Sequence, residues 1–262
     1  MALKYQALWL GDLEHRMIQV ERARRATLAG FGLALPGTPD LGDLDGRLEA
    51  HGVALGTPVF MRIFKREFEL ELWLLRDGRF HRFATYPICR WSGSLGPKLA
   101  QGDGQAPEGF YTVDEKALNP ESRWHRSFNL GFPNAFDRAH GRTGSLLMVH
   151  GGCSSIGCVA MTNPVIDEIW RLVTAAMRNG QKRFQVQVFP FRMTDGNMER
   201  HAASPGAEFW RGLKTGHDLF EADLLPPRVS VCKGRYVFEP ADATTDGSTP
   251  IEAKCPPAKP AA

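Results

Sequence analysis

The chain has 262 residues, of which 43% are hydrophobic and 23% are charged, and its formal net charge is +3. Such values are ordinary for a globular chain that buries a sizeable core. Basic and acidic residues are interspersed, unlike the concentrated basic face of nucleic-acid binders, and no apolar run approaches the roughly 18 residues needed to cross a membrane. We therefore expect no nucleic-acid partner and no membrane span.

Residues 1–56 predict a helical accessory segment. Within it, residues 12–29 place apolar side chains near one face of a helix, and Gly30 ends that pattern. Residues 35–58 are rich in Gly, Pro and Asp and predict one short helix at 43–51. We interpret the whole stretch as an accessory segment and not as a separate domain.

A β-rich region is predicted over residues 57–195. Apolar residues from Phe68 to Leu74 alternate with glutamates, as in a half-buried strand, and Asp77-Gly78 fits a tight hairpin turn. A helix is predicted from Asn163, followed by Pro164, up to Gly180. The other predicted strands are 57–64, 79–86, 110–113, 145–149 and 184–189. The pattern predicts a mostly β fold of the α+β class with flanking helices.

The C-terminal part of the chain predicts an extension and a tail. Residues 196–238 contain an aromatic-bearing helix at 204–220 and a final strand at 228–238. Residues 239–262 consist mainly of Pro, Ala, Thr and Ser and lack core-forming residues, which predicts a disordered tail.

The stretch "MVHGGCSSIGCVAM", residues 148–161, holds a histidine and two cysteines behind an apolar strand. A cysteine attacks as its thiolate, which a nearby histidine makes accessible near neutral pH. His150 and Cys158 could form such a pair across the Gly-rich turn. Gly157 would let backbone N–H groups face a developing oxyanion.

This stretch admits three other interpretations. Zinc could be bound by His150, Cys153, Cys158 and Cys232, but the second short knuckle of a structural zinc site is missing. A serine nucleophile is rejected because "GCSSIG" lacks the G-x-S-x-G spacing. The glycines could simply form turns around small buried cysteines. The five cysteines are an odd number and predict no disulfide framework; they are Cys89, Cys153, Cys158, Cys232 and Cys255.

The same stretch resembles the signature of the L,D-transpeptidase (YkuD-like) catalytic domain, which is H-G, a loop, and then S-H-G-C-[IV]-R-M. Upstream, "QAPEGFYTV" is similar to the family's T-P-x-G-x-[FY]-x-[IV] element. The stretches "YPICRWSGSLGPKL", "SRWHRSFNLGFPNAFDRAHGRTG" and "DEIW" resemble the YafK-like branch of the family. The resemblance covers roughly residues 57–195, and it implies a β-sandwich or barrel catalytic domain there.

The resemblance implies a cysteine enzyme that acts on peptidoglycan. Cys158 would attack the carbonyl at the L-centre of meso-diaminopimelate in a stem peptide, with His150 as general base. The Gly151 carbonyl would orient the imidazole, and the N–H groups of Gly157 and Cys158 would form the oxyanion hole. The branch is associated with hydrolysis that releases a murein lipoprotein from peptidoglycan. A transpeptidase and an inactive cell-wall-binding module are the alternatives.

The chain departs from the family signature at two positions. Ile156 stands where the family has histidine, and Ala160 replaces its arginine. These departures bear on the acyl acceptor, and they suggest the binding-module alternative. A second His-Gly pair makes His140 the alternative base, although His150 follows the strand as the family's histidine does. Cys153 has no counterpart in the signature and could form a reversible disulfide with Cys158 under oxidation.

Further residues in the matched segments are candidates for substrate binding. Arginines there could pair with stem-peptide carboxylates, since a guanidinium binds a carboxylate through two hydrogen bonds. Aromatic residues could line the cleft. The candidates are Arg90, Arg123, Arg138, Arg142 and Trp91, together with Trp124 and Phe132.

The resemblance also implies the partners and the compartment. The expected partners are stem peptides with meso-diaminopimelate and the C-terminus of a murein lipoprotein. No metal and no cofactor are expected, since a thiol nucleophile needs neither. The substrate implies a periplasmic location. The chain itself shows no signal peptide, so we expect that one has been removed.

Overall fold

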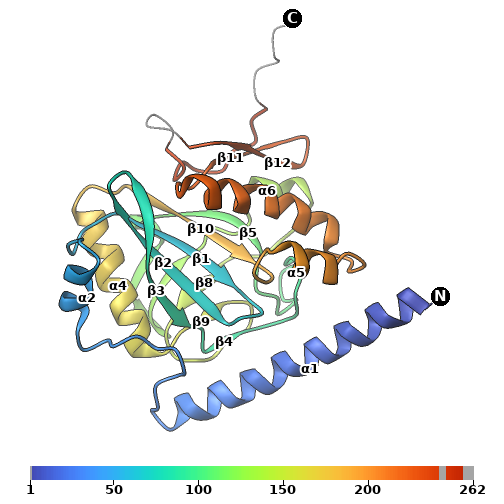
Figure 1. Ribbon diagram of the computed structural model, residues 1–262, viewed down its shortest axis with the longest axis horizontal. Helices are drawn as coiled ribbons and strands as arrows, with labels where there is room; N and C mark the ends of the chain where they lie inside the picture. Colours follow the sequence, from blue (N-terminus) through green and yellow to red (C-terminus); the bar gives the residue numbers. More distant parts are fainter. Residues whose placement is uncertain (1, 242–245, 256–262) are drawn as a thin grey trace, which may run out of the picture.

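The computed structural model describes residues 2–241 and 246–255, with the backbone alone for residues 2–11. Two five-stranded sheets form its body (Figure 1). The first sheet has the order β3-β2-β1-β10-β5, and the second has the order β4-β9-β8-β7-β6. Neither sheet closes into a barrel among the described residues, so the fold is α+β with mixed sheets, and only the predicted barrel form is absent there.

The strand bounds follow the chain order. The first sheet contains β1 (Val59–Phe64), β2 (Glu69–Arg76), β3 (Arg79–Pro87), β5 (Gly109–Asp114) and β10 (Arg183–Phe189). The second contains β4 (Arg90–Trp91), β6 (Leu118–Ser122), β7 (His125–Asn129), β8 (Met148–His150) and β9 (Val159–Ala160).

The main core lies on the inner face of the first sheet, where alternate side chains of each strand point the same way. Met61 and Ile63 of β1 and Val186 of β10 belong to this core, together with Val149 and Val159 of the second sheet. All five are fully buried. The second sheet is therefore fixed to the first through the apolar side of β8 and β9, which leaves their other side for polar residues.

Six helices surround the sheets in the described part of the chain (Figure 1). They are α1 (Ala2–Gly30), α2 (Leu44–Ala50), α3 (Ala135–Ala139), α4 (Asn163–Arg178), α5 (Asp195–Arg200) and α6 (Ala207–Asp223), and Glu115–Ala117 form a 3-10 turn. The predicted helices are thus present, although α1 is longer than predicted. Pro164 lies in the first turn of α4, where its missing N–H leaves no helical hydrogen bond unmade. None of the described helices is both long and apolar enough to span a membrane.

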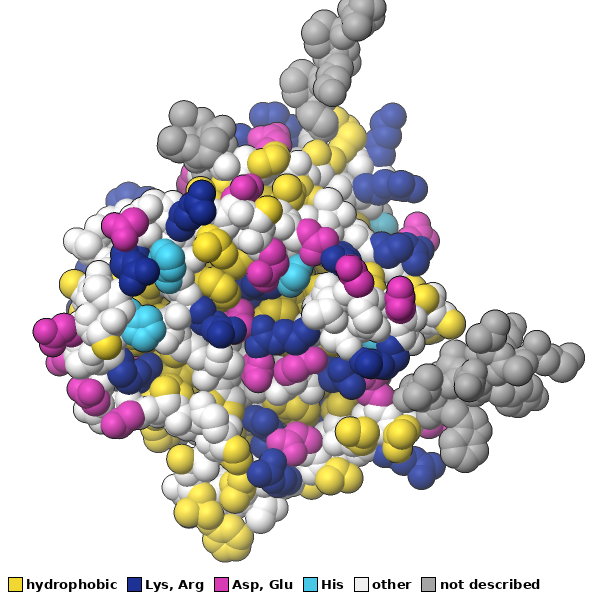
Figure 2. All heavy atoms as spheres, in the orientation of Figure 1, with side chains coloured by type: hydrophobic (Ala, Val, Ile, Leu, Met, Phe, Trp, Pro, Cys, Tyr) yellow, Lys and Arg dark blue, Asp and Glu magenta, His cyan; other side chains and the backbone are white. Residues whose placement is uncertain are grey.

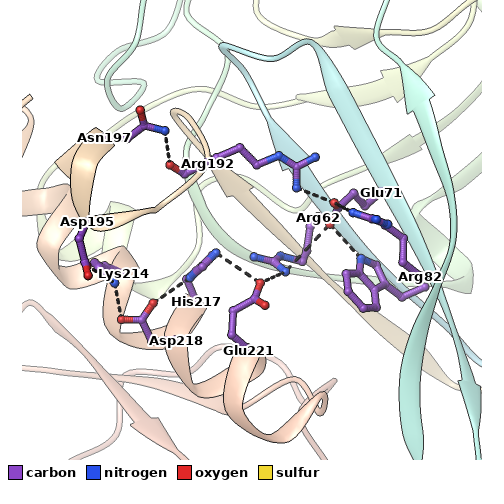
Figure 3. Close-up of polar contacts among 11 residues, drawn as sticks. Arg62, Glu71, Arg82, Arg192, Asp195, Asn197, Lys214, His217, Asp218 and Glu221 are labelled. Carbon is purple, nitrogen blue, oxygen red and sulfur yellow. Dashed lines mark hydrogen bonds and ion pairs between the residues drawn. The ribbon is translucent and has the colours of Figure 1, made fainter. Parts of the chain in front are cut away.

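Helix α6 and the loop after β10 are attached to the outer face of the first sheet by ion pairs that each have one buried partner (Figure 3). Arg62 of β1 has a side chain 2% exposed and donates to Glu221 of α6 at 2.6 Å. Glu71 of β2 accepts from Arg82 at 3.0 Å and from Arg192 at 2.5 Å. A buried charge is tolerated only when it is paired. This network therefore fixes α6 and the loop after β10 against the sheet.

The predicted final strand is a hairpin. Two strands, β11 (Arg228–Cys232) and β12 (Arg235–Glu239), pair antiparallel around Lys233 and Gly234. Both turn residues have positive φ, which a single extended strand could not accommodate. The sequence prediction missed the turn because the flanking residues form one continuous β-favouring run.

Part of the predicted tail is also ordered. Residues 242–245 and 256–262 lie outside the described residues. Residues 246–255, for which disorder was predicted, instead lie against β11, where Val231 bridges to Ala253 and Ile251 is buried. A disulfide joins Cys232 to Cys255 and closes this segment onto the hairpin. The prediction failed because composition alone does not reveal a covalent tie.

Candidate active site

The candidate nucleophile and base lie on adjacent parallel strands of the second sheet. Strand β8 pairs with β9 through Val149 opposite Val159 and His150 opposite Ala160. The register places Cys158, directly before β9, beside Met148, whose N–H donates to the Cys158 thiol at 3.4 Å. Since residues two apart on a strand share a face, Cys158 and His150 are diagonal neighbours on the polar face.

His150 is held as a neutral base. Its side chain is 2% exposed, and Nδ1 lies 2.5 Å from the Gly151 carbonyl oxygen. A carbonyl only accepts, so Nδ1 carries the hydrogen and Nε2 keeps its lone pair. Burial lowers the pKa of His150, while the Gly151 carbonyl opposes this shift. The Gly151 carbonyl thus has the orienting contact that the family resemblance implies.

Cys158 is a thiol at rest and not a thiolate. Burial raises its pKa, whereas the Met148 N–H and the Lys98 ammonium act in the opposite direction. Its Sγ also lies 3.6 Å from the Leu146 carbonyl oxygen, which suits a thiol donor. If Cys158 acts as a nucleophile, its proton therefore has to leave the sulfur during the attack.

Two glycines of the turn are required by geometry. A Cβ added to Gly151 would lie 2.6 Å from Asn163 Oδ1 and 3.0 Å from an Ile166 methyl, so no side chain fits. Gly157 has φ +108, in a region that other residues rarely adopt. The glycines therefore let the chain pass close to α4 and turn sharply into the nucleophile.

The two predicted oxyanion donors differ in their bonding. The Gly157 N–H already donates to the Ser92 hydroxyl, which lies in the loop after β4. The Cys158 N–H makes no hydrogen bond with the described residues. Of the two predicted donors, only Cys158 is free as the structure stands.

The remaining cysteines form disulfides. Cys89 is bonded to Cys153, with 5.2 Å between their Cα atoms, and Cys232 is bonded to Cys255. Cys158 is the one free thiol among the described residues. The zinc interpretation is wrong, because Cys153 and Cys232 are consumed, and the described residues contain no cluster suited to a metal ion. The expected Cys153–Cys158 disulfide is likewise not formed, since Cys153 is paired with Cys89.

Trp124 lies over the candidate base. Its ring centroid is 6.1 Å from that of His150, its side chain is 42% exposed, and a Cβ on Gly152 would lie 3.1 Å from the indole. Arg123 is exposed, with its guanidinium 5.7 Å from the Trp124 ring centroid. Arg90 of β4 is partly exposed and pairs with Ala160, beside His150. These three predicted residues border the polar face that carries the site.

Other predicted residues are engaged elsewhere. His140 lies at the end of α3, where its Nε2 is 3.0 Å from the Gly234 carbonyl oxygen of the β11–β12 turn. This nitrogen must donate there, so His140 is a poor alternative base. Arg142 pairs with Asp137 at 2.8 Å. Arg138 donates to the carbonyl of Pro133.

Trp91 and Phe132 belong to the core. Trp91 is fully buried against the Phe68 ring, with the Arg22 guanidinium 4.1 Å from its ring centroid. Phe132 is 4% exposed. Large apolar rings are most often buried in this way, and neither can contact substrate without unpacking.

A large groove lies away from this site. It has a volume of about 2540 Å³ between α1, α3 and α6 and is not lined by His150 or Cys158. Its wall includes Pro97 and Leu99, the neighbours of the Lys98 that acts on the Cys158 thiol. Figure 2 shows basic and acidic side chains interspersed over this side of the molecule. The candidate nucleophile and base therefore lie on the strands of the second sheet and not in the wall of this groove.

Three residues near the site were missed from the sequence. Ser92 and Ser155 contact the nucleophile turn, and Lys98 lies close enough to favour the Cys158 thiolate. Ser155 occupies the serine position of the family's S-H-G-C signature, which was a usable signal. Ser92 and Lys98 lie in the quoted stretch "RWSGSLGPKL", where nothing in their spacing indicates a role.

The chain matches a known protein family over half of its length. Residues 69–199 match the YkuD family, described as the L,D-transpeptidase catalytic domain. Two curated relatives from Escherichia coli strains K12 and O157:H7, each named "Putative L,D-transpeptidase YafK", are 52% identical over 183 residues, which cover 70% of this chain and 74% of theirs.

Solved structures were compared as well. The helical cell shape determining protein Pgp2 from Campylobacter jejuni is 21% identical with a TM-score of 0.41, over 67% of this chain and 65% of that chain. Bd1075 from Bdellovibrio bacteriovorus is 20% identical with a TM-score of 0.37, over 62% and 60%. The family assignment rests on the sequence matches, and on those matches this chain belongs to the L,D-transpeptidase catalytic domain family.

Proposed function

We propose that the protein is a cysteine amidase of peptidoglycan that hydrolyses the link between a stem peptide and a murein lipoprotein. The observation that carries the proposal is the placement of Cys158, the one free thiol among the described residues, on the same face of β8 and β9 as the oriented imidazole of His150. The family shown by the comparisons is consistent with a substrate in the cell wall. The hydrolytic outcome is supported by the resemblance to the YafK-like branch.

The first half of the reaction forms a thioester. Cys158 Sγ attacks the carbonyl carbon at the L-centre of meso-diaminopimelate while His150 Nε2 takes the thiol proton. The Cys158 N–H, which makes no hydrogen bond with the described residues, donates to the oxyanion. As the C–N bond breaks, His150 returns the proton to the departing lysine amine. The products are an acyl-enzyme and a released lipoprotein C-terminus.

The second half regenerates the thiol. A water molecule attacks the thioester carbonyl and gives its proton to His150, the C–S bond breaks, and the proton passes to the sulfur. The stem peptide leaves with a free carboxylate. An amine in place of water would make a new amide bond, which is the transpeptidase reaction that the names of the relatives describe.

Basic side chains beside the site suit an anionic stem peptide. Arg90 lies next to Ala160 in β4, and Arg123 is exposed beside Trp124. A guanidinium can hold a carboxylate through two charge-assisted hydrogen bonds. We propose these two arginines as substrate-binding residues, with Trp124 covering the chain near the base.

The proposed compartment is the periplasm. Two disulfides pair four of the five cysteines, and disulfides persist in oxidising compartments such as the bacterial periplasm. The cell-wall substrate of the family requires the same location.

Product analysis separates hydrolysis from transpeptidation. The wild type and Cys158→Ala would be incubated with a diaminopimelate tripeptide muropeptide that carries a C-terminal Lys-Arg remnant, and products would be identified by mass spectrometry. We expect the wild type alone to release Lys-Arg and leave the free tripeptide. An intact substrate, combined with exchange of the terminal residue of a tetrapeptide, would establish the transpeptidase in place of the amidase. Inertness toward both substrates would indicate the binding module.

A further inference from the structure

Ser92 lies where the loop after β4 meets the nucleophile turn, and neither the family signature nor the proposed mechanism uses it. Its hydroxyl accepts the Gly157 N–H and lies 3.1 Å from the Ser155 hydroxyl. Ser155 in turn donates to the Cys158 carbonyl at 2.6 Å. Two hydroxyls therefore connect the backbone groups on both sides of the nucleophile.

The donor and the acceptor of every hydrogen bond in this series are fixed. Ser155 has one hydroxyl hydrogen, and the Cys158 carbonyl accepts it. Ser92 must therefore donate to the Ser155 oxygen while its own oxygen accepts from Gly157. The result is one directed series, Gly157 N–H to Ser92, Ser92 to Ser155 and Ser155 to the Cys158 carbonyl. Such series strengthen each member and resist rearrangement.

Ser92, which lies in the loop after β4, is held in place by contacts of its own backbone and of its neighbours. The Ser92 carbonyl accepts from the Ala106 N–H at 3.0 Å, and the preceding Trp91 is fully buried. Arg22 of α1 donates to the Gly93 carbonyl at 2.8 Å with its guanidinium over the Trp91 ring. Ser92 is thus fixed from both sides by the core and by α1.

We propose that Ser92 is a positioning residue for acyl transfer at Cys158. The two serines hold the Gly157 N–H and the Cys158 carbonyl in place beside β4. They thereby set the orientation of the peptide group between Gly157 and Cys158, which carries the free Cys158 N–H. That orientation decides the direction in which the N–H donates to the oxyanion. The proposal rests on the proposed thiol chemistry, and it adds a residue through which the turn is held. A misplaced donor weakens catalysis because oxyanion stabilisation depends on fixed geometry.

The test compares a reaction that forms an oxyanion with one that does not. With p-nitrophenyl acetate, the Cys158 sulfur bonds to the acetyl carbon, p-nitrophenolate leaves, and the thiol proton passes to His150. With iodoacetamide, the sulfur displaces iodide at a saturated carbon and no oxyanion forms. The variants are Ser92→Ala, which removes the hydroxyl, Ser92→Thr, which keeps it, and Ser94→Ala, a matched control in the same loop. The Cys158→Ala variant gives the background.

We expect Ser92→Ala to slow Cys158-dependent ester acylation about 10- to 100-fold while alkylation changes less than about twofold. On the muropeptide, its kcat falls by the same factor with KM nearly unchanged, because substrate binding is not altered. Ser92→Thr recovers most of the rate, and Ser94→Ala matches the wild type.

Three results would overturn the role of Ser92. If Ser92→Ala is acylated as fast as the wild type or faster, Ser92 does not position the turn and only accepts the Gly157 N–H, which keeps that donor from the oxyanion. Equal losses in alkylation and acylation would place the effect on the thiol itself. If the wild type is not acylated by the ester, Cys158 has no working oxyanion site for Ser92 to position. If acylation depends on Ser92 but the muropeptide is not cleaved, the proposed function fails while the positioning role stands.

Discussion

Burial of both His150 and Cys158 decides how the proton moves in this site. It lowers the pKa of the imidazole and raises that of the thiol, so both are neutral near pH 7. An ion pair of a thiolate and an imidazolium before substrate binding would need a lowered pKa for the thiol and a raised pKa for the imidazole. We therefore expect the imidazole to act as a general base during attack, since its Nδ1 contact with Gly151 leaves the Nε2 lone pair available.

The pH dependence of catalysis follows from the His150 shift. Only the neutral ring can take the thiol proton, so kcat/KM is lost as the pH falls through the pKa of His150, which lies below its usual 6.5. We expect the acid limb of kcat/KM to have its midpoint below pH 6.5. Steady-state rates between about pH 4 and 9 measure it. His140→Ala, which removes the other candidate base, should leave the profile unchanged, and a midpoint above 6.5 would contradict this account.

The sequence predicts His150 and Cys158 as the candidate pair, but it does not reveal the contacts that support them. Residue types alone left a zinc site and a plain Gly-rich turn open, and the resemblance to the family signature favoured the pair. Ser92 is 65 residues from Gly157 in sequence, and only the pairing of β4 with β9 brings them together. Arg142 and Trp91 looked like substrate contacts, but the structure engages both elsewhere. Arg142 is buried and paired with Asp137, and Trp91 packs against Phe68 and Arg22, which are distant from it in sequence.

The short strands β4 and β9 carry most of the geometry of the site. Each has two residues, too few for any alternation to predict it from sequence. Two links nevertheless join the residues that flank β4 to the turn before β9. They are the Ser92 contact with Gly157 and the Cys89–Cys153 disulfide. Longer elements such as α4 and β2 were predicted because their periodicity runs over several turns or residue pairs.

The Cys89–Cys153 disulfide is expected to stabilise both the fold and the active turn. Closing a loop of 64 residues restricts the unfolded chain more than closing the 23 residues between Cys232 and Cys255, by about 1 kcal/mol. Replacing Cys89 and Cys153 with serine should lower the free energy of unfolding by about 2–4 kcal/mol and reduce turnover. Denaturant unfolding and muropeptide assays measure the two effects.

The second disulfide provides the matched control. Replacing Cys232 and Cys255 with serine should destabilise the C-terminal hairpin, with a smaller loss of unfolding free energy and unchanged turnover. Equal turnover in both double variants would show that the tie at Cys153 has no effect on catalysis. A larger loss of stability from the second pair would contradict the loop-length argument.

At the scale of the whole molecule, two sheets enclose the core and divide the surface by function. The first sheet carries α6 and the β11–β12 hairpin on its outer face (Figures 1 and 3). The second turns its polar side outward with His150 and Cys158 upon it. The class of fold was predictable from alternation and turn residues. The sheet order was not, since β1 and β10 pair in parallel across 118 residues of intervening sequence. The predicted segment boundaries stay a prediction.

The central claim is that acyl transfer passes through the sulfur of Cys158. Rapid mixing with the muropeptide, acid quenching, intact-mass measurement and peptide mapping would test it most directly. We predict a stem-peptide adduct on Cys158 that hydroxylamine removes, that is absent from Cys158→Ala, and that forms slowly in His150→Ala. Product release by Cys158→Ala at the wild-type rate, or an adduct on any other residue, would contradict the account.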